Sequence, residues 1–318
     1  MKIVLLGTLL GMVAIVFPGQ GSQKPGMGQS LAQEYSEAAA VFDRVSAALS
    51  QDVRKLLWET DEETLRQTQN AQVGLYTVGL AAWEVLKARI PEGTVEAAAG
   101  HSVGEYAAIA AAGVVSLEDG ARLVAERGRL MSEVTGGSMA AVLGLDREAL
   151  DAACAEAGGT VVVANDNSPG QLVISGESAA VAKAGELASA KGAKRVIPLN
   201  VSGAFHSPLM QGPAFEMRKA LQTASFGYGN LKVYANVTAE PVTDASEWKG
   251  LLELQLQRPV RWTETIQNMR RDGARIFIEC GAGEVLSGLL RRIDKEAKGL
   301  RVGDPESLEE TRLALGSA

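Results

Sequence analysis

The chain has 318 residues, 46% of them hydrophobic and 22% charged, and a formal net charge of −7. This composition is that of an ordinary globular protein with one large domain, or with one domain that carries an insertion. The acidic, mixed charge excludes a concentrated basic face, so we expect no nucleic-acid partner. Cys154 and Cys280 lie far apart and give no metal-ligand or disulfide spacing, so we expect no metal site and a reducing, cytoplasmic location.

The first residues have some character of a secretion signal, because a lysine precedes an apolar stretch. Two glycines interrupt that stretch, and no small-residue cleavage site precedes Pro18. Residues 13–17 instead have the pattern of a buried strand, which Pro18 and Gly19 end. We therefore interpret residues 1–11 as an extension, take Met12 as the functional start, and expect no membrane association.

Short strands alternate with long helical patterns from residue 13 to about residue 136. Leu75, Val78, Ala82 and Leu86 recur at helical spacing, and Ser116 is a candidate N-cap. The patterns predict strands over 13–17 and 95–99, and helices over 27–49, 71–90, 103–112 and 117–134. Strands separated by helices predict a parallel α/β sheet.

The pattern changes at Gly136-Gly137. It then predicts strands over 138–145, 160–164, 171–175 and 195–199, helices over 146–157 and 178–191, and a turn over 165–170 that contains Asn165 and Asn167. This βαββαβ order is that of a ferredoxin-like unit. We predict a core domain of residues 1–136 and 201–318, with a strand over 274–280 and a helix from Glu284, and an inserted subdomain of residues 137–200.

Gly100-His101-Ser102-Val103-Gly104 is a G-x-S-x-G pentapeptide between the predicted strand 95–99 and the predicted helix 103–112. In a nucleophile elbow the serine lies on a tight strand-to-helix turn where only glycine fits on either side. The alternative is a plain turn whose serine caps the helix. The context favours Ser102 as a nucleophile.

A serine hydroxyl needs a base, and the chain contains only two histidines. His101 is next to Ser102, and neighbours on a tight turn usually point apart. His206, in the turn-like stretch Gly203-Ala204-Phe205-His206-Ser207-Pro208, is therefore the better candidate for the base.

A glycine-rich loop, Phe17-Pro18-Gly19-Gln20-Gly21-Ser22-Gln23, follows the first strand. It lacks the Gly-Lys-Ser/Thr ending of a phosphate-binding P-loop. The alternative is that a backbone N–H of this loop is one donor of an oxyanion hole. The backbone N–H of Val103, the residue after the nucleophile, would then be the second donor.

These segments resemble the malonyl-CoA:acyl carrier protein transacylase family. The resemblance runs from about residue 13 to 293, with motifs in the same order at 17–23, 100–107, 127–131, 165–171, 203–210, 258–262 and 277–290. It implies an α/β-hydrolase-like core with an inserted ferredoxin-like subdomain. It also implies malonyl transfer from coenzyme A to the phosphopantetheine thiol of acyl carrier protein, by a ping-pong route that supplies fatty acid synthesis.

The resemblance also implies the roles of individual residues. Ser102 would be acylated, and His206 would be its base and then the acid for the leaving thiolate. Backbone N–H groups of Gln20 and Val103 would form the oxyanion hole. A backbone carbonyl near Gln255 would orient the histidine, so that no third carboxylate is needed. The residues expected to contact the substrate are Arg127, which would hold the malonyl carboxylate, and Gln255, Phe205 and His101.

Taken without the resemblance, Arg127 beside Glu126 has the pattern of a solvated helix charge.

Two other functions also stay open: a serine hydrolase, and a non-catalytic module that docks carrier protein. We expect malonyl-CoA and acyl carrier protein as partners, no permanently bound cofactor beside the coenzyme A thioester substrate, and a monomer. Basic residues that could steer an acidic carrier protein are Lys191, Lys194, Arg195, Arg218 and Lys219.

Overall fold

This computed structural model describes residues 11–201 and 203–316. The larger of its two sheets is parallel and has five strands. Across the sheet the strands are β7 (Lys232–Tyr234), β2 (Val95–Gly100), β1 (Met12–Phe17), β8 (Ala274–Cys280) and β9 (Lys298–Val302). The predicted N-terminal extension falls outside the described residues except for Gly11, and β1 begins at Met12.

Both faces of this sheet are covered, as parallel sheets require. Along β1 every side chain is buried: Val13 and Ile15 belong to the larger apolar core, and Ala14 and Val16 to a second core on the other face. The uninterrupted apolar run of β1 follows from this double burial.

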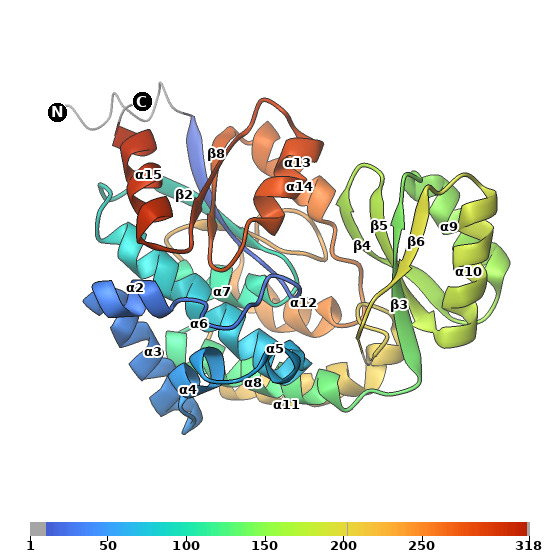
Figure 1. Ribbon diagram of the computed structural model, residues 1–318, viewed down its shortest axis with the longest axis horizontal. Coiled ribbons are helices and arrows are strands. Elements are labelled where there is room, and N and C mark those ends of the chain that lie inside the picture. The colour runs from blue at the N-terminus through green and yellow to red at the C-terminus, as the bar shows by residue number, and fades with distance from the viewer. Residues whose placement is uncertain (1–10, 202, 317–318) are drawn as a thin grey trace.

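The larger core packs under helices on one side of the sheet, and α13 and α14 cover the other side (Figure 1). In chain order the helices of the core are α2 (Gln29–Glu34), α3 (Ser36–Leu49), α4 (Val53–Trp58), α5 (Glu62–Arg66), α6 (Thr68–Lys87), α7 (Gly104–Ala111), α8 (Leu117–Ser132), the 3-10 turn η1 (Pro208–Met210), α11 (Gln211–Thr223), the 3-10 turn η2 (Ala245–Glu247), α12 (Trp248–Gln255), α13 (Trp262–Arg271), α14 (Val285–Ile293) and α15 (Pro305–Gly316).

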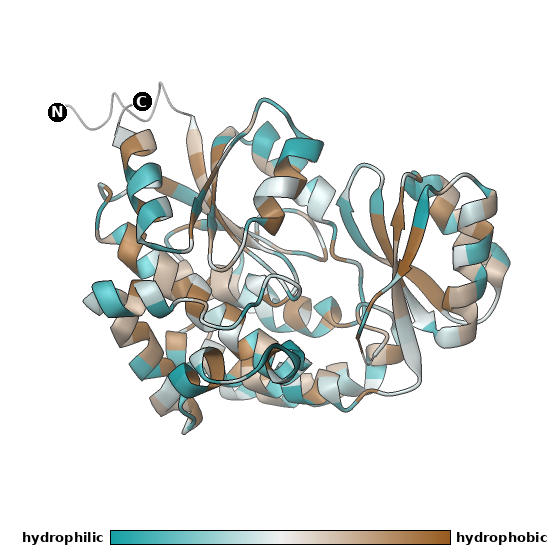
Figure 2. Ribbon diagram, in the orientation of Figure 1, coloured by the Kyte–Doolittle hydropathy of each residue, from teal (hydrophilic) through white to brown (hydrophobic). Residues whose placement is uncertain are grey.

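A separate antiparallel sheet lies beside the core (Figure 1). In chain order its elements are β3 (Gly137–Leu143), α9 (Arg147–Ala157), β4 (Val161–Ser168), β5 (Gln171–Glu177), α10 (Ser178–Ala190) and β6 (Arg195–Pro198). The strand order β4-β5-β3-β6 is that of a ferredoxin-like unit, and α9 and α10 cover one face with an apolar core of their own. Figure 2 shows hydrophobic residues concentrated on the strands of both sheets. The predicted fold class is confirmed.

Two predicted elements differ from the structure. The helix predicted over 27–49 is broken at Tyr35, which is extended (φ −123°, ψ 124°) and whose ring lies 4.4 Å below the Arg89 guanidinium. The turn predicted over 165–170 is wrong as well, because β4 continues to Ser168 and leaves only Pro169-Gly170 to turn. The turn preference of asparagine is overridden by strand pairing, since residues 165–168 pair with β5.

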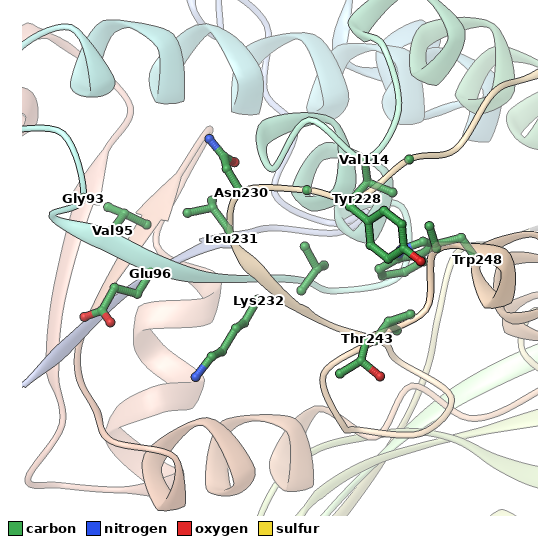
Figure 3. A pocket seen from close by; sticks show the side chains of 15 residues that line it. Gly93, Val95, Glu96, Val114, Tyr228, Asn230, Leu231, Lys232, Thr243 and Trp248 are labelled. Carbon is green, nitrogen blue, oxygen red and sulfur yellow. The ribbon is translucent and has the colours of Figure 1, made fainter.

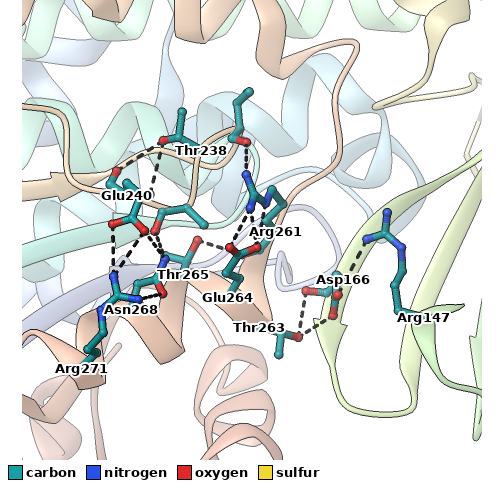
Figure 4. Close-up of polar contacts among 12 residues, drawn as sticks. Arg147, Asp166, Thr238, Glu240, Arg261, Thr263, Glu264, Thr265, Asn268 and Arg271 are labelled. Carbon is teal, nitrogen blue, oxygen red and sulfur yellow. Dashed lines mark hydrogen bonds and ion pairs between the residues drawn. The ribbon is translucent and has the colours of Figure 1, made fainter.

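A backbone junction joins β4 to the core. Asn165 forms a parallel bridge with Val260, and the Asp166 N–H donates to the Val260 carbonyl at 2.9 Å. The Asp166 carboxylate also accepts from the Thr263 hydroxyl at 2.6 Å, and Arg147 lies on its other side at 3.8 Å (Figure 4). This junction attaches the small sheet directly to the segment that follows α12.

Both cysteines are buried free thiols. Among residues 11–201 and 203–316 there is no helix both long and apolar enough to cross a membrane.

Candidate active site

Ser102 occupies a sharp turn between β2 and α7. Its φ is +53°, a left-handed conformation that is unusual for a residue with a side chain. A Cβ at Gly100 would lie 2.0 Å from the Gly104 carbonyl oxygen, and one at Gly104 would lie 2.2 Å from the Phe17 carbonyl oxygen. Both glycines of the pentapeptide are therefore required by close backbone approach, and the segment has the geometry of a nucleophile elbow.

His206 faces Ser102 from the segment before η1. Its Nε2 lies 2.8 Å from Ser102 Oγ, and its Nδ1 lies 2.7 Å from the Gln255 carbonyl oxygen. Because a carbonyl can only accept, Nδ1 carries the proton and Nε2 is free to accept one from Ser102. Burial, with the nearby Arg127 charge, lowers the pKa of His206 to about 3, so the ring is neutral near neutral pH.

Arg127 is buried beneath this pair, with only 1% of its surface exposed. Its guanidinium donates to Gln72 Oε1 at 2.6 Å, to Ser102 Oγ at 3.0 Å and to Gln255 Oε1 at 3.0 Å. These three acceptors are neutral, and the Arg127 Nε has no hydrogen-bond partner within the described part of the chain. A buried charge without a carboxylate partner is costly, and this one is placed to take a carboxylate from a ligand.

Three residues that sequence reasoning missed hold this arrangement. Asn236, two residues beyond β7, accepts from the Ser102 N–H at 2.8 Å and donates to the Gly100 carbonyl at 2.6 Å. Glu105 is buried on the first turn of α7 and accepts from the Gln255 side-chain amide. Gln72, on α6, bonds both Arg127 and Met131 Sδ. In the sequence, these residues are marked only by their polarity and position. Asn236 lies just past a parallel strand, and Glu105 and Gln72 lie in helices with many apolar residues.

His101 points away from Ser102, toward the small sheet. Its Nε2 lies 2.7 Å from Asn167 Oδ1, and its ring packs edge-on against Trp262 at 5.7 Å. Asn165 and Asn167, predicted as turn residues, therefore lie in β4 and line the same cavity as His101. Burial lowers the pKa of His101, which favours the neutral ring.

A cavity of about 460 Å³ opens between the core and the small sheet, with Ser102, His206 and Arg127 in its wall. The residues predicted to form the oxyanion hole or to contact the substrate also line it: Gln20, Val103, Phe205 and His101. Gln255 lies behind the wall and is fully buried. The structure thus places all eight predicted site residues at or directly behind one cavity.

The five basic residues predicted to steer a carrier protein fall in two regions: Arg218 and Lys219 lie on α11, and Lys191, Lys194 and Arg195 lie between the end of α10 and the start of β6. Three of them are paired with carboxylates: Lys191 with Glu156 at 3.0 Å, Arg218 with Glu253 at 2.5 Å and Lys219 with Glu216 at 2.8 Å. Lys194 and Arg195 are exposed at the start of β6.

A second cavity of about 450 Å³ lies at the edge strand β7, beside the exposed Tyr228 ring (Figure 3). Lys232 and Glu96 lie at its rim. The described residues that line it include no serine, cysteine or histidine, so it offers no Ser-His or Cys-His pair.

The raised pKa of Glu105 should make the free energy of unfolding depend on pH. Burial raises this pKa from 4.5 to about 7, so between those values the folded chain holds a proton that the unfolded chain releases. Ionisation therefore opposes folding as the pH rises through this window. We therefore compare the free energy of unfolding of Glu105→Gln with that of the unsubstituted protein. When the pH is raised from about 4.5 to about 7.5, this difference should move in favour of the variant by roughly 3 kcal/mol at most. Urea unfolding at both pH values measures this gain.

The control is Glu96→Gln, which removes an exposed carboxyl from β2. Its difference in unfolding free energy from the unsubstituted protein should be the same at both pH values. A Glu105→Gln difference that is equally constant would contradict the buried, perturbed carboxyl.

A serine on an elbow, a neutral histidine and a buried arginine that is bonded only to neutral groups among the described side chains lie at one cavity of an α/β fold. Together they define a serine enzyme of the acyl-transfer class. A family model described as an acyl transferase domain matches residues 14–302. The chain is 41% identical over 307 residues to the malonyl CoA-acyl carrier protein transacylase of Bacillus subtilis, covering 94% of this chain and 96% of that protein. It belongs to the malonyl CoA-acyl carrier protein transacylase family.

Solved structures agree. The acyl-carrier-protein S-malonyltransferase of Bartonella henselae superposes with a TM-score of 0.92 at 42% identity, covering 96% of this chain and 99% of that one. A malonyl-transacylase solved in complex with a type II PKS acyl-carrier protein superposes with a TM-score of 0.92 at 38% identity, covering 96% of this chain and 100% of that one.

Proposed function

We propose that this protein transfers a malonyl group from coenzyme A to the phosphopantetheine thiol of acyl carrier protein, through a malonyl ester of Ser102, in fatty acid synthesis. The observation that carries the proposal is the buried Arg127 guanidinium, 3.0 Å from Ser102 Oγ and without a carboxylate partner among the described residues. A planar guanidinium offers parallel donors to a carboxylate, which is the group that distinguishes malonyl from acetyl.

The proposed acylation moves one proton and exchanges one bond. Ser102 Oγ attacks the thioester carbonyl carbon while His206 Nε2 takes the hydroxyl proton, a transfer that their 2.8 Å separation allows. The N–H groups of Gln20 and Val103, on two loops of the cavity wall, stabilise the oxyanion. When the C–S bond breaks, His206 gives its proton to the leaving coenzyme A thiolate.

The second half-reaction reverses these steps with another thiol. His206 takes the proton from the phosphopantetheine thiol of the carrier protein, and the sulfur attacks the carbonyl carbon of the malonyl ester. As the ester C–O bond breaks, His206 returns the proton to Ser102 Oγ, which restores the free serine. Hydrolysis is the competing outcome, because the same pair would deliver the acyl group to water. The ester would lie in a cavity between the core and the small sheet, whose walls limit the directions from which water can reach it.

We also propose that the core, residues 1–136 and 201–318, and the subdomain, residues 137–200, form the two walls of the substrate cleft. Phe205 lines this cleft, and its ring would crowd the 2-methyl group of a methylmalonyl substrate. One methyl group changes the selectivity of a pocket by about 10–200-fold.

The coenzyme A thioester is a substrate and no resident cofactor is needed. We propose a cytoplasmic monomer.

The variant Arg127→Ala tests whether Arg127 selects malonyl-CoA over acetyl-CoA. We expect kcat/KM for malonyl-CoA to fall by roughly 10–150-fold, the value of one charged hydrogen bond. Acetyl-CoA should react as fast as before or faster, because it leaves the guanidinium of the unsubstituted protein unpaired. Measurement of kcat/KM for both thioesters gives the change in preference.

The matched control is Arg129→Ala, which removes an exposed arginine of the same helix that is paired with Glu126 and Glu133. It should leave both values within about twofold, as surface ion pairs contribute little. Equal losses for malonyl-CoA and acetyl-CoA in Arg127→Ala would show that Arg127 supports the fold or binds coenzyme A instead.

A further inference from the structure

We propose that Glu105 is a positioning residue of the acyl-transfer site: its carboxylate holds Gln255 and Asn236, and through them His206 and the Ser102 turn, in their reactive arrangement. The inference rests on the proposed roles of Ser102 and His206. Glu105 itself lies behind the cavity wall, so it acts through its neighbours rather than on the substrate.

Glu105 is placed by the elbow itself. It is the second residue of α7, three positions after Ser102, and 1% of its surface is exposed. In that position a carboxylate also lies at the N-terminal end of the helix, where negative charge is stabilised. Its two oxygens accept from different segments, Oε1 from the Asn236 N–H at 3.3 Å and Oε2 from the Gln255 amide.

The contact with Gln255 fixes which way that amide faces. Gln255 Nε2 donates to Glu105 and to the Ser102 carbonyl at 2.9 Å, so its Oε1 is left to accept from Arg127 at 3.0 Å. The backbone carbonyl of the same residue accepts from His206 Nδ1 at 2.7 Å. A Gln255 that rotates or shifts therefore disturbs the proposed base and the proposed carboxylate clamp together.

The contact with Asn236 reaches the nucleophile from the other side. The backbone N–H of Asn236 donates to Glu105, while its side chain accepts from the Ser102 N–H at 2.8 Å and donates to the Gly100 carbonyl at 2.6 Å. These bonds hold the strained turn on which Ser102 has a φ of +53°. Glu105 is the one side chain among those described that bonds both Gln255 and Asn236.

Only an ionised carboxyl satisfies both partners. Each partner presents an N–H, and a carboxylate accepts at both oxygens. A glutamine of the same size has one oxygen and one NH₂, so one of the two contacts becomes donor against donor. Glu105→Gln therefore changes hydrogen bonding with little change in volume.

The charged and titratable groups around Glu105 come from three elements. Arg127 on α8 favours its ionised form, Tyr106 is its neighbour on α7, and His206 lies beyond Gln255. Burial is the larger effect and raises the pKa of Glu105 to about 7, whereas that of His206 is lowered to about 3. A loss of acylation rate between pH 8 and pH 6 would thus report Glu105 and not His206.

The chain offers a matched control in Glu279. This carboxylate is equally buried, and it accepts from the N–H groups of Leu286 and Ser287 at 3.0 and 2.8 Å, where it holds the start of α14. It has no bond to a residue of the proposed site among the described contacts. Glu279→Gln therefore reports the general effect of removing a buried carboxylate.

The experiment measures the single-turnover rate of malonyl-Ser102 formation from malonyl-CoA by rapid-quench intact-mass spectrometry, from about pH 5.5 to pH 9. We expect Glu105→Gln to lower the rate at saturating substrate by roughly 10–100-fold, as misplacement of reacting groups does. The malonyl-CoA concentration at half-maximal rate should change less than the rate. The unsubstituted protein should lose rate as the pH falls through about 7, and Glu105→Gln should not show that transition.

Glu279→Gln should keep both the rate and the pH transition. A Glu105→Gln rate within about threefold of the unsubstituted protein, a loss no larger than that of Glu279→Gln, or an unchanged pH transition would overturn the inference. Where Glu105→Gln does not fold, Glu105→Asp replaces it, with a lowered rate and a shifted transition expected, and unchanged values overturning the inference. Absence of any malonyl-Ser102 in the unsubstituted protein would refute the proposed function, whereas an unchanged rate of ester formation in Glu105→Gln refutes only the role of Glu105.

Discussion

Replacement of Ser102 by alanine is expected to abolish the covalent malonyl adduct and to lower malonyl transfer by roughly 10⁵–10⁶-fold, the loss typical of a removed serine nucleophile. The reason is that Ser102 Oγ, the proposed nucleophile, would form the bond to the acyl group, and it lies 2.8 Å from Nε2 of His206, the proposed base. Intact-mass spectrometry after addition of malonyl-CoA should show one added malonyl group in the unsubstituted protein and none in Ser102→Ala.

Ser132→Ala is the control for this result. That hydroxyl lies at the end of α8 and donates only to the Arg129 carbonyl of its own helix at 2.7 Å. The variant should acquire the malonyl group as the unsubstituted protein does. An adduct that survives in Ser102→Ala would assign the nucleophile to another residue.

Replacement of His206 by alanine is expected to slow acylation by about 10²–10⁴-fold, the usual contribution of a positioned base. His206 is the histidine whose Nε2 reaches Ser102, and its Nδ1–H is anchored on the Gln255 carbonyl. The pre-steady-state release of coenzyme A from malonyl-CoA measures the effect, and circular dichroism verifies that the variant is folded.

His101→Ala separates base catalysis from the loss of any histidine near the serine. His101 is bonded to Asn167 and packs against Trp262, so its loss should weaken substrate binding more than it slows acylation. If His101→Ala slows acylation more than His206→Ala, with both proteins folded, the base has been assigned to the wrong histidine.

The strands and the elbow could be predicted because their signals are local. β1 is an apolar run ended by Pro18-Gly19, and the helix α8 begins after Ser116, whose hydroxyl accepts from the Asp119 N–H as an N-cap does. The glycines of the elbow are explained by the backbone contacts that they allow. In each case the residues that decide the structure lie within a few positions of one another.

The residues that hold the site could not be predicted from local patterns, because their partners are distant in the chain. Gln255 donates to the carbonyl of Ser102, 153 positions away, and Asn236 accepts from its N–H across 134 positions. Arg127 illustrates the same limit: its neighbour Glu126 pairs instead with Arg129, and only the packing of α8 against α6 shows that Arg127 is buried. The segment 165–168 has turn composition, and only its pairing with β5 and Val260 makes it a strand.

The acceptor that anchors His206 is a main-chain oxygen of residue 255, and this has an evolutionary consequence. No codon change at that position can remove a peptide carbonyl, so the acceptor is inherited with the path of the chain rather than with the identity of an amino acid. A search for a conserved acidic residue as the third member of a Ser-His pair would therefore find nothing at this place. A substitution at position 255 would keep a carbonyl in the chain, but it would remove the side-chain contacts with Glu105 and Arg127 that hold this carbonyl in position.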